Sequence, residues 1–213
     1  MITCIRVALA LLCVVTLCNA GEQCNCEPEE ILETISEVLE YRDAWPFLSS
    51  PDTLYLMRLP EYTSSYGIQC VISTLDEENP LAFPSVRRWI LYINSIQGQE
   101  WQRISVTLTM ERITASNSSS SFTTDDLPKF GRRFPVVFAD SKCLIFRILT
   151  NIVDGRTGCA WWVKEGAKDK PLWHCKLIFN FFCAVSYQQI YSEEACDRLT
   201  KQRKISNRRS VNL

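Results

Sequence analysis

The eleven cysteines carry the most reactive side chains in this sequence of 213 residues. Three of them, Cys4, Cys13 and Cys18, lie within the first 20 residues, and eight remain in the rest of the chain. A cysteine thiolate acts as a nucleophile or as a metal ligand, and in an oxidising compartment two cysteines form a disulfide. The compartment therefore decides which of these chemistries is open to the remaining eight.

The first 20 residues predict that compartment. Arg6 precedes an apolar run over residues 7–15, and small residues follow at Cys18 and Ala20. This order is typical of a secretory signal peptide. The run is too short for a spanning helix, which needs about 20 apolar residues. The sequence therefore predicts a secreted, extracellular protein without a membrane span, from which residues 1–20 are removed.

Eight cysteines in a secreted chain predict four disulfides. The set consists of Cys24, Cys26, Cys70, Cys143, Cys159, Cys175, Cys183 and Cys196. Their connectivity stays open, because eight cysteines allow about 105 pairings. A metal site at Cys24-x-Cys26 is the weaker alternative, because the single histidine, His174, lies far along the chain.

Enzymatic chemistry has little support in the sequence. A Cys–His nucleophile that uses His174 would need a free thiol, which an oxidised framework does not leave. The sequence contains no Gly-rich phosphate loop and no Gly-x-Ser-x-Gly motif. We interpret the paired carboxylates Glu77-Glu78 and Asp125-Asp126 as solvated loop charges. The sequence thus predicts no enzyme, with no catalytic residue, no cofactor and no metal.

The charged residues are distributed unevenly. Of the 23 basic and 24 acidic residues, one basic residue lies in the leader and six lie in residues 198–213, so residues 21–197 carry a net charge of −8. An acidic body argues against nucleic acid as the partner. The basic tail is predicted to be disordered. It is either a solvated extension or a weak, salt-sensitive contact to sulfated glycans.

Seven segments have the composition and alternation of β-strands. They are residues 53–59, 66–74, 87–94, 101–113, 134–139, 142–150 and 158–164. Helices are predicted from residue 27 onward, in a region that Pro46 ends, and over residues 171–184. This order predicts a mainly β fold, an antiparallel sheet closed into a barrel or sandwich with a helix at each end.

A closed barrel of about eight strands can hold one small ligand. The aromatic residues on or beside the predicted strands either fill the core or line an apolar cavity. Residues 115–124 are rich in Ser and Thr and are predicted to form a loop. This loop contains an N-glycosylation acceptor at Asn117, so we expect a glycoprotein.

An ordered set of motifs runs over residues 43–197: Asp43-Ala44-Trp45, Cys70-Val71, Cys143-Leu144-Ile145, Ala160-Trp161-Trp162, Cys175 and Cys196. This set resembles the tick salivary lipocalins, the family of histamine-binding proteins. The resemblance implies a lipocalin-like eight-stranded antiparallel barrel with an N-terminal and a C-terminal helix packed outside. It divides the chain into a signal peptide (1–20), a helical extension (21–42), a barrel domain (43–197) and a tail (198–213).

The resemblance also implies two disulfides. They join Cys70 to Cys196 and Cys143 to Cys175. A third bridge is expected between Cys159 and Cys183, while Cys24 and Cys26 have no assigned partner.

The resemblance implies a ligand cavity, with one departure from the family pattern. The family places two acids in its cavity to bind amines, and this sequence has Leu144 and Ala160 there, while Trp162 is kept. An ammonium group in a dry cavity needs a compensating charge. We therefore expect an apolar, lipid-like ligand rather than a biogenic amine such as histamine. The expected ligand-binding residues are Tyr55, Tyr62, Trp89, Leu144, Phe146, Ala160 and Trp162.

Charged residues elsewhere on or beside the predicted strands allow two kinds of ligand head group, a carboxylate or an amine. A fatty-acid carboxylate would need a cation near the cavity, for which Arg58, Arg87 and Arg147 are candidates. Glu61 or Glu111 would instead replace the lost acids and restore amine binding.

Two classes of function stay open. The resemblance implies a secreted salivary lipocalin that sequesters a small host mediator and so evades the host immune response. The alternative is a protein-binding module, in which the barrel is a scaffold against a host haemostatic or complement protein.

Overall fold

The structure is a computed structural model, and it describes residues 40–61, 67–94, 101–111, 120–153, 156–183, 186–198 and 200–201. Several sequence predictions lie outside these residues. They are the signal peptide, most of the N-terminal helical extension, the cysteines Cys24 and Cys26, the candidate ligand residue Tyr62 and the glycosylation acceptor Asn117.

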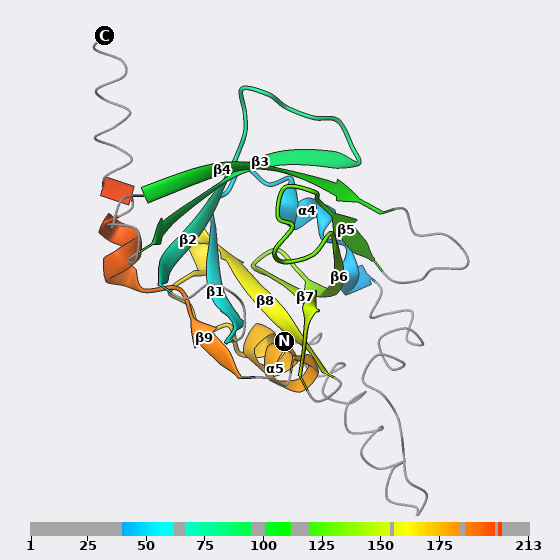
Figure 1. The fold of residues 1–213 in the computed structure, drawn as a ribbon, viewed down its shortest axis with the longest axis vertical. Helices are drawn as coiled ribbons and strands as arrows, with labels where there is room; N and C mark the ends of the chain where they lie inside the picture. Colours follow the sequence, from blue (N-terminus) through cyan, green and yellow to red (C-terminus); the bar gives the residue numbers. More distant parts are fainter. Residues whose placement is uncertain are drawn as a thin grey trace, which may run out of the picture.

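Eight antiparallel strands form a closed barrel (Figure 1). They are β1 (Leu54–Pro60), β2 (Ile68–Leu75), β3 (Ser85–Asn94), β4 (Trp101–Met110), β5 (Ser121–Thr123), β6 (Arg133–Ala139), β7 (Cys143–Val153) and β8 (Arg156–Lys164). Sheet order runs from β2 through β8 to β1, and β1 also pairs with β2. The predicted eight-stranded antiparallel barrel is thereby confirmed.

The seam between β1 and β2 is short, because these strands share only two residue pairs. A ninth strand, β9 (Tyr187–Gln189), pairs with the later part of β1. The backbone N–H of Cys70 on β2 donates to the carbonyl of Ile190 at 3.2 Å, and Cys70 forms a disulfide with Cys196. The C-terminal segment therefore bridges both sides of the seam.

Alternation along the strands separates two apolar layers. In β4 the side chains of Val106, Leu108 and Met110 are buried inside the barrel, and the predicted period of two is confirmed there. A second layer lies outside the barrel, where Ile145 of β7 and Val163 of β8 are fully buried. A strand with both faces buried must be apolar on both faces.

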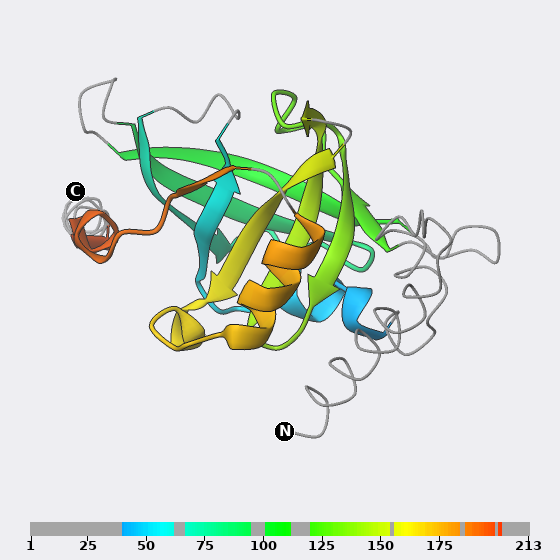
Figure 2. The ribbon, with the colours of Figure 1, turned by 90° about the horizontal axis from the view of Figure 1, so that it is seen from below.

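Helix α5 (Trp173–Phe182) covers this outer layer and lies along the outside of the barrel (Figure 2). Its side chains Cys175, Ile178 and Phe179 are buried, as their helical spacing predicts. The bridge Cys143–Cys175 fixes the start of α5 to β7, and the bridge Cys159–Cys183 fixes the residue after its end to β8. With Cys70–Cys196, these are the three disulfides that were expected.

Two local predictions are wrong. Pro46 does not end a helix but lies in the first turn of α4 (Trp45–Leu48), which follows the 3₁₀ turn η1 (Glu40–Arg42). Proline suits that position because the first backbone N–H groups of a helix have no partner within it. The segment 115–124 is not entirely a loop, because its last part forms β5.

The C-terminal end also differs from the prediction. Residues 193–198 and 200–201 are helical, so the predicted disorder does not begin at residue 198. Residues 202–213 lie outside the described part of the chain. A further 3₁₀ turn, η3 (Glu165–Ala167), follows β8. In the described ranges, no helix combines the length and the apolar character that crossing a membrane requires.

Candidate ligand cavity

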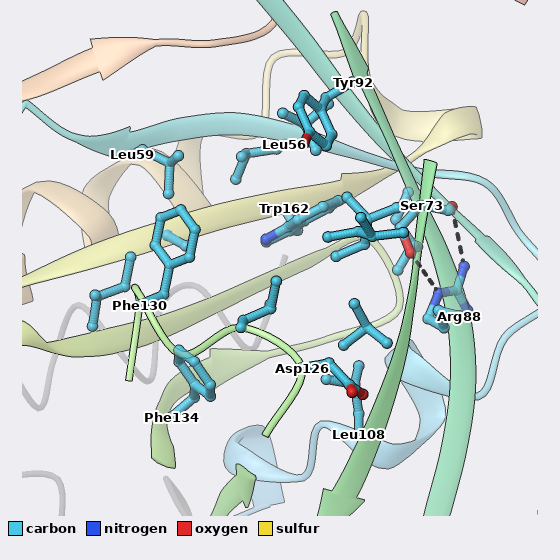
Figure 3. Close-up of a pocket in the computed structure, with 18 of the residues that line it drawn as sticks. Leu56, Leu59, Ser73, Arg88, Tyr92, Leu108, Asp126, Phe130, Phe134 and Trp162 are labelled. Carbon is cyan, nitrogen blue, oxygen red and sulfur yellow. Dashed lines mark hydrogen bonds between the residues drawn. The ribbon is translucent and has the colours of Figure 1, made fainter. Parts of the chain in front are cut away.

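A cavity of ≈ 460 Å³ lies inside the barrel. Its walls are mostly aliphatic and aromatic, and each of the eight barrel strands contributes residues to them. The close-up in Figure 3 shows the labelled members of this lining. Pockets that bind small molecules usually enclose about 300–1,000 Å³ and are largely apolar with a few polar groups. The cavity therefore has the size and the character of a site for one small apolar ligand.

Four of the predicted ligand residues form one wall of the cavity. Leu144 lies opposite Trp162, and Phe146 lies opposite Ala160, in the ladder between β7 and β8. All four line the cavity. Leu144 and Ala160 are almost completely buried, so an acid at either position would be enclosed by apolar neighbours. This wall provides dispersion contacts and no charge.

Three phenylalanines from different strands pack against one another in the wall. The ring centroids of Phe122 and Phe146 are 5.0 Å apart, and those of Phe134 and Phe146 are 5.5 Å apart. Phe122 and Phe134 stack with centroids 5.3 Å apart. Offset and edge-to-face pairs at these distances are favourable beyond the area that they bury. The cluster gives the cavity a stiff aromatic side.

Arg88 closes the inner end of the cavity, and the sequence reasoning missed it. Its side chain is 1% exposed and lines the cavity beside α4 and the turn that follows. Burial lowers the pKa of Arg88 to about 10, against a smaller opposing effect of Asp52, so the guanidinium stays charged at neutral pH. In β3, the alternate residues Ile90 and Tyr92 also face the cavity.

A few other polar groups reach the cavity. Tyr92 lies on β3, four residues after Arg88, and its Oη donates to Gln102 Oε1 at 2.6 Å. Asp126 is the one carboxylate among the described lining residues, and it is exposed. Its Oδ2 accepts a hydrogen bond from the backbone N–H of Thr107 at 2.7 Å. The described lining thus contains a buried cation, Arg88, and an exposed acid, Asp126, whose partner Thr107 is next to Val106, the residue opposite Arg88 in the sheet.

Two predicted ligand residues lie on the outer face of the barrel. Tyr55 packs edge-on against Tyr191 with ring centroids 5.7 Å apart and donates to Glu165 at 3.4 Å. Burial, reinforced by Glu165, raises the pKa of Tyr55 to about 12. The guanidinium of Arg103 lies 3.5 Å from the ring centroid of Trp89. Both predictions are wrong about the facing of the residue, because a shift of one position reverses the face in a strand.

The three predicted cations do not line the cavity either. Arg58 lies outside the barrel, with its Cζ 4.1 Å from the ring centroid of Tyr187. Arg147 donates to Thr157 at 2.7 Å and also contacts the carbonyl of Phe182 after α5. Arg87 is absent from the lining, whereas its neighbour Arg88 is present.

The two acids proposed as replacements are also outside. Glu61 is exposed after β1. Glu111 accepts hydrogen bonds from Arg133 Nε at 2.7 Å and from the hydroxyl of Ser121. Burial alone would raise the pKa of Glu111, but these two bonds outweigh it and hold the pKa below the usual range. Neither carboxylate is available to an amine in the cavity.

Among the described residues, potential metal ligands gather beside the start of α5. Ligand atoms of Asp140, Cys143, His174 and Cys175 all lie within 4.8 Å of one another. The two sulfurs are bonded to each other, so they are not thiolates. His174 Nε2 and Asp140 Oδ2, 2.9 Å apart, leave only two ligands, whereas zinc sites use three or four. The cluster holds α5 against the turn between β6 and β7.

Comparison with known proteins agrees with this architecture. The family model described as tick histamine binding protein matches residues 33–198. Among solved structures, the chain resembles japanin from Rhipicephalus appendiculatus bound to cholesterol, with a TM-score of 0.53 and 14% identity over 69% of this chain and 97% of that chain. At this identity the likeness shows a shared lipocalin-like fold. No curated protein sequence matches the chain significantly. The chain therefore belongs to the tick histamine-binding protein family.

Proposed function

We propose that this protein is a secreted lipocalin that sequesters a small, largely apolar host mediator inside its barrel. The observation that carries the proposal is the wall formed by Leu144, Phe146, Ala160 and Trp162, which is apolar at both positions where the family resemblance implies acids. Apolar surface removed from water contributes about 25 cal/mol per Å², so such a wall favours hydrocarbon.

An amine is disfavoured by the same geometry. An ammonium group that leaves water needs a carboxylate partner, and the described lining offers only Asp126, which is exposed. Trp162 could offer a cation–π contact of roughly 0.5–2 kcal/mol, which is small beside the loss of an ion pair. Histamine is therefore expected to bind weakly.

Two further observations support the proposal. The structurally similar japanin was crystallised with cholesterol, which is a large apolar molecule. The three disulfides among the described residues suit an oxidising, extracellular environment and fit the predicted signal peptide. A role in evading host defence follows if the bound molecule is a host signal.

A cavity-filling variant tests the proposal. Ala160 is buried in the cavity wall opposite Phe146, so Ala160→Trp should occupy the space that a ligand needs. Ala82→Trp places the same side chain at an exposed position and is the matched control. The measurement is native mass spectrometry of purified protein, followed by calorimetric titration with fatty acids, cholesterol and histamine.

We expect an apolar ligand to bind the wild type and Ala82→Trp, and to be lost in Ala160→Trp. Equal binding of apolar ligands by both tryptophan variants would place the ligand elsewhere than in the cavity. Tight histamine binding by the wild type, with no binding of any apolar ligand, would contradict the proposed ligand class.

A further inference from the structure

A buried polar pair lies at the closed end of the largely apolar cavity, beside α4. Arg88 Nε donates to Ser73 Oγ at 3.0 Å, and both residues line the cavity from the neighbouring strands β3 and β2 (Figure 3). Ser73 is 4% exposed and Arg88 is 1% exposed, so both are shielded from bulk water. We refer to them as the Ser73–Arg88 pair.

Arg88 has no hydrogen bond left for a ligand. A guanidinium has five N–H donors. Nε donates to the hydroxyl of Ser73, and Nη2 donates to the backbone carbonyl of Ser73. The other three N–H groups donate to backbone carbonyls of three other residues. Those carbonyls belong to Leu48, Ser50 and Asp52, at distances of 2.7, 2.8 and 2.9 Å. All five donors are therefore used by uncharged acceptors of the protein.

The hydroxyl of Ser73, unlike the guanidinium of Arg88, still has a proton to donate to a ligand. A serine hydroxyl has two lone pairs and one proton to donate, and one lone pair receives the bond from Arg88. Among the described residues, the hydroxyl of Ser73 accepts this bond from Arg88 and donates none. Because Ser73 lines the cavity, the proton can be donated to a group in the cavity. A donor bonded to a cation at its own oxygen is polarised and donates more strongly.

The positive charge of Arg88 also favours a hydrogen-bond acceptor in this part of the cavity. None of its five bonds goes to a carboxylate, and the nearest acid, Asp52, has its carboxylate 3.1 Å from Lys164 Nζ and near Ser50. The positive charge at the closed end is therefore incompletely compensated. A buried positive charge attracts an electronegative group and repels an ammonium group, and the low local dielectric strengthens both effects.

We propose that the Ser73–Arg88 pair is the head-group subsite of the cavity, and that it accepts an oxygen acceptor, most favourably a carboxylate, at the inner end of an apolar ligand. The Ser73 hydroxyl donates the hydrogen bond, and Arg88 orients this hydroxyl and supplies the positive potential. The inference rests on the proposed function and adds the chemical class of the head group. It also gives the ligand a direction, with the head at the closed end and the hydrocarbon toward Tyr92.

Three ligands that differ only in the head group test the subsite. Hexadecanoic acid, 1-hexadecanol and hexadecylamine share one chain length, so the ratios of their dissociation constants report on the head group alone. They are measured at pH 7.4 by displacement of a fluorescent fatty-acid probe. We expect the dissociation constant of the acid to be lower than that of the alcohol by a factor of about ten or more. We expect the dissociation constant of the amine to be higher than that of the alcohol by a factor of about ten or more.

Substitutions at Ser73 separate a binding role from a structural one. Ser73→Ala removes the donor and should reduce the preference for the acid over the alcohol by about ten-fold, whereas Ser73→Thr keeps a hydroxyl and should restore it. Ser105→Ala removes an exposed serine from the outer face of β4 and is the control. General destabilisation by Ser73→Ala would weaken all three ligands together and leave the ratios unchanged.

The outcomes distinguish the two proposals. If the alcohol binds, and the amine binds as tightly as the acid, the subsite is overturned while the proposed apolar cavity stands. Ratios that stay unchanged in Ser73→Ala would also overturn the subsite. If none of the three ligands binds the wild type, the proposed function and the subsite that rests on it both fail.

Discussion

Leu144 lies directly opposite Trp162 in the ladder between β7 and β8, and both side chains face the cavity. Trp162 is the aromatic residue that the family resemblance expects, and Leu144 stands where the resemblance expects an acid. The cavity therefore keeps a surface on which a ring could stack and lacks the charge that would hold an amine.

Restoring the two acids should convert the cavity to amine binding. We expect Leu144→Asp combined with Ala160→Glu to raise the affinity for histamine by about ten-fold or more, because each acid would be desolvated beside the bound ammonium. Isothermal titration with histamine measures the gain. The pair Leu144→Asn and Ala160→Gln has similar shape without charge, and an equal gain in that variant would rule out the electrostatic explanation.

The phenylalanine cluster should contribute strongly to stability. Phe134 is 2% exposed and contacts Phe122 and Phe146, so Phe134→Ala leaves a void in a wall that cannot collapse fully. Truncation of a buried aromatic side chain costs about 3–5 kcal/mol. Urea unfolding followed by tryptophan fluorescence gives the value. Leu177→Ala on the exposed side of α5 should change stability by less than about 0.5 kcal/mol, and a similar loss in both variants would contradict the prediction.

The disulfides Cys70–Cys196 and Cys159–Cys183 should differ in their contribution to stability according to the length of chain that each encloses. Cys70–Cys196 spans 126 residues of sequence, whereas Cys159–Cys183 spans 24. Loop-closure entropy assigns about 5 kcal/mol to the first and about 3.5 kcal/mol to the second. Paired alanine substitutions, compared by the free energy of unfolding in urea, check the order. A greater loss on removing Cys159–Cys183 would show that its link to α5 matters more than the entropy of the unfolded chain.

Acid should weaken the contact between Glu111 and Arg133. The pKa of Glu111 is lower in the folded protein than in the unfolded chain, so its contribution is complete above the ordinary glutamate pKa and disappears as pH falls through the lowered value. Both side chains are partly exposed, so we expect less than about 1 kcal/mol. The measurement is the stability difference between the wild type and Glu111→Gln from pH 7 down to pH 2, with Glu61→Gln as control. A difference that persists at pH 2 would contradict this assignment.

The sequence predicted the strands best where one face of the sheet is wet. In β4 the inward residues Val106 and Leu108 alternate with polar outward residues, so the pattern identified both the strand and its facing. β3 could not be oriented in this way, because Leu91 and Ile93 are buried outside the barrel while Ile90 faces the cavity. With both faces apolar, alternation carries no information about which face is inside.

Local composition also hid two features. β5 consists of three residues in a Ser- and Thr-rich segment, and it exists because β4 and β6 pair with it from both sides. Arg88 was missed because a buried arginine becomes favourable only when distant carbonyls, here those of Leu48 and Ser50, converge on it. The strands that pair with β5 and the carbonyls that bind Arg88 are distant in the sequence, so the residues next to β5 and Arg88 in the chain do not reveal them.

The bridged seam between β1 and β2 has a consequence for biosynthesis. During synthesis Cys70 leaves the ribosome 126 residues before its partner Cys196. Cys143, Cys159, Cys175 and Cys183 are all synthesised within this interval, before the native partner of Cys70 is present. The native connectivity therefore requires that none of these four thiols stays paired with Cys70, and the bridges that tie both ends of α5 to β7 and β8 give each of them another partner.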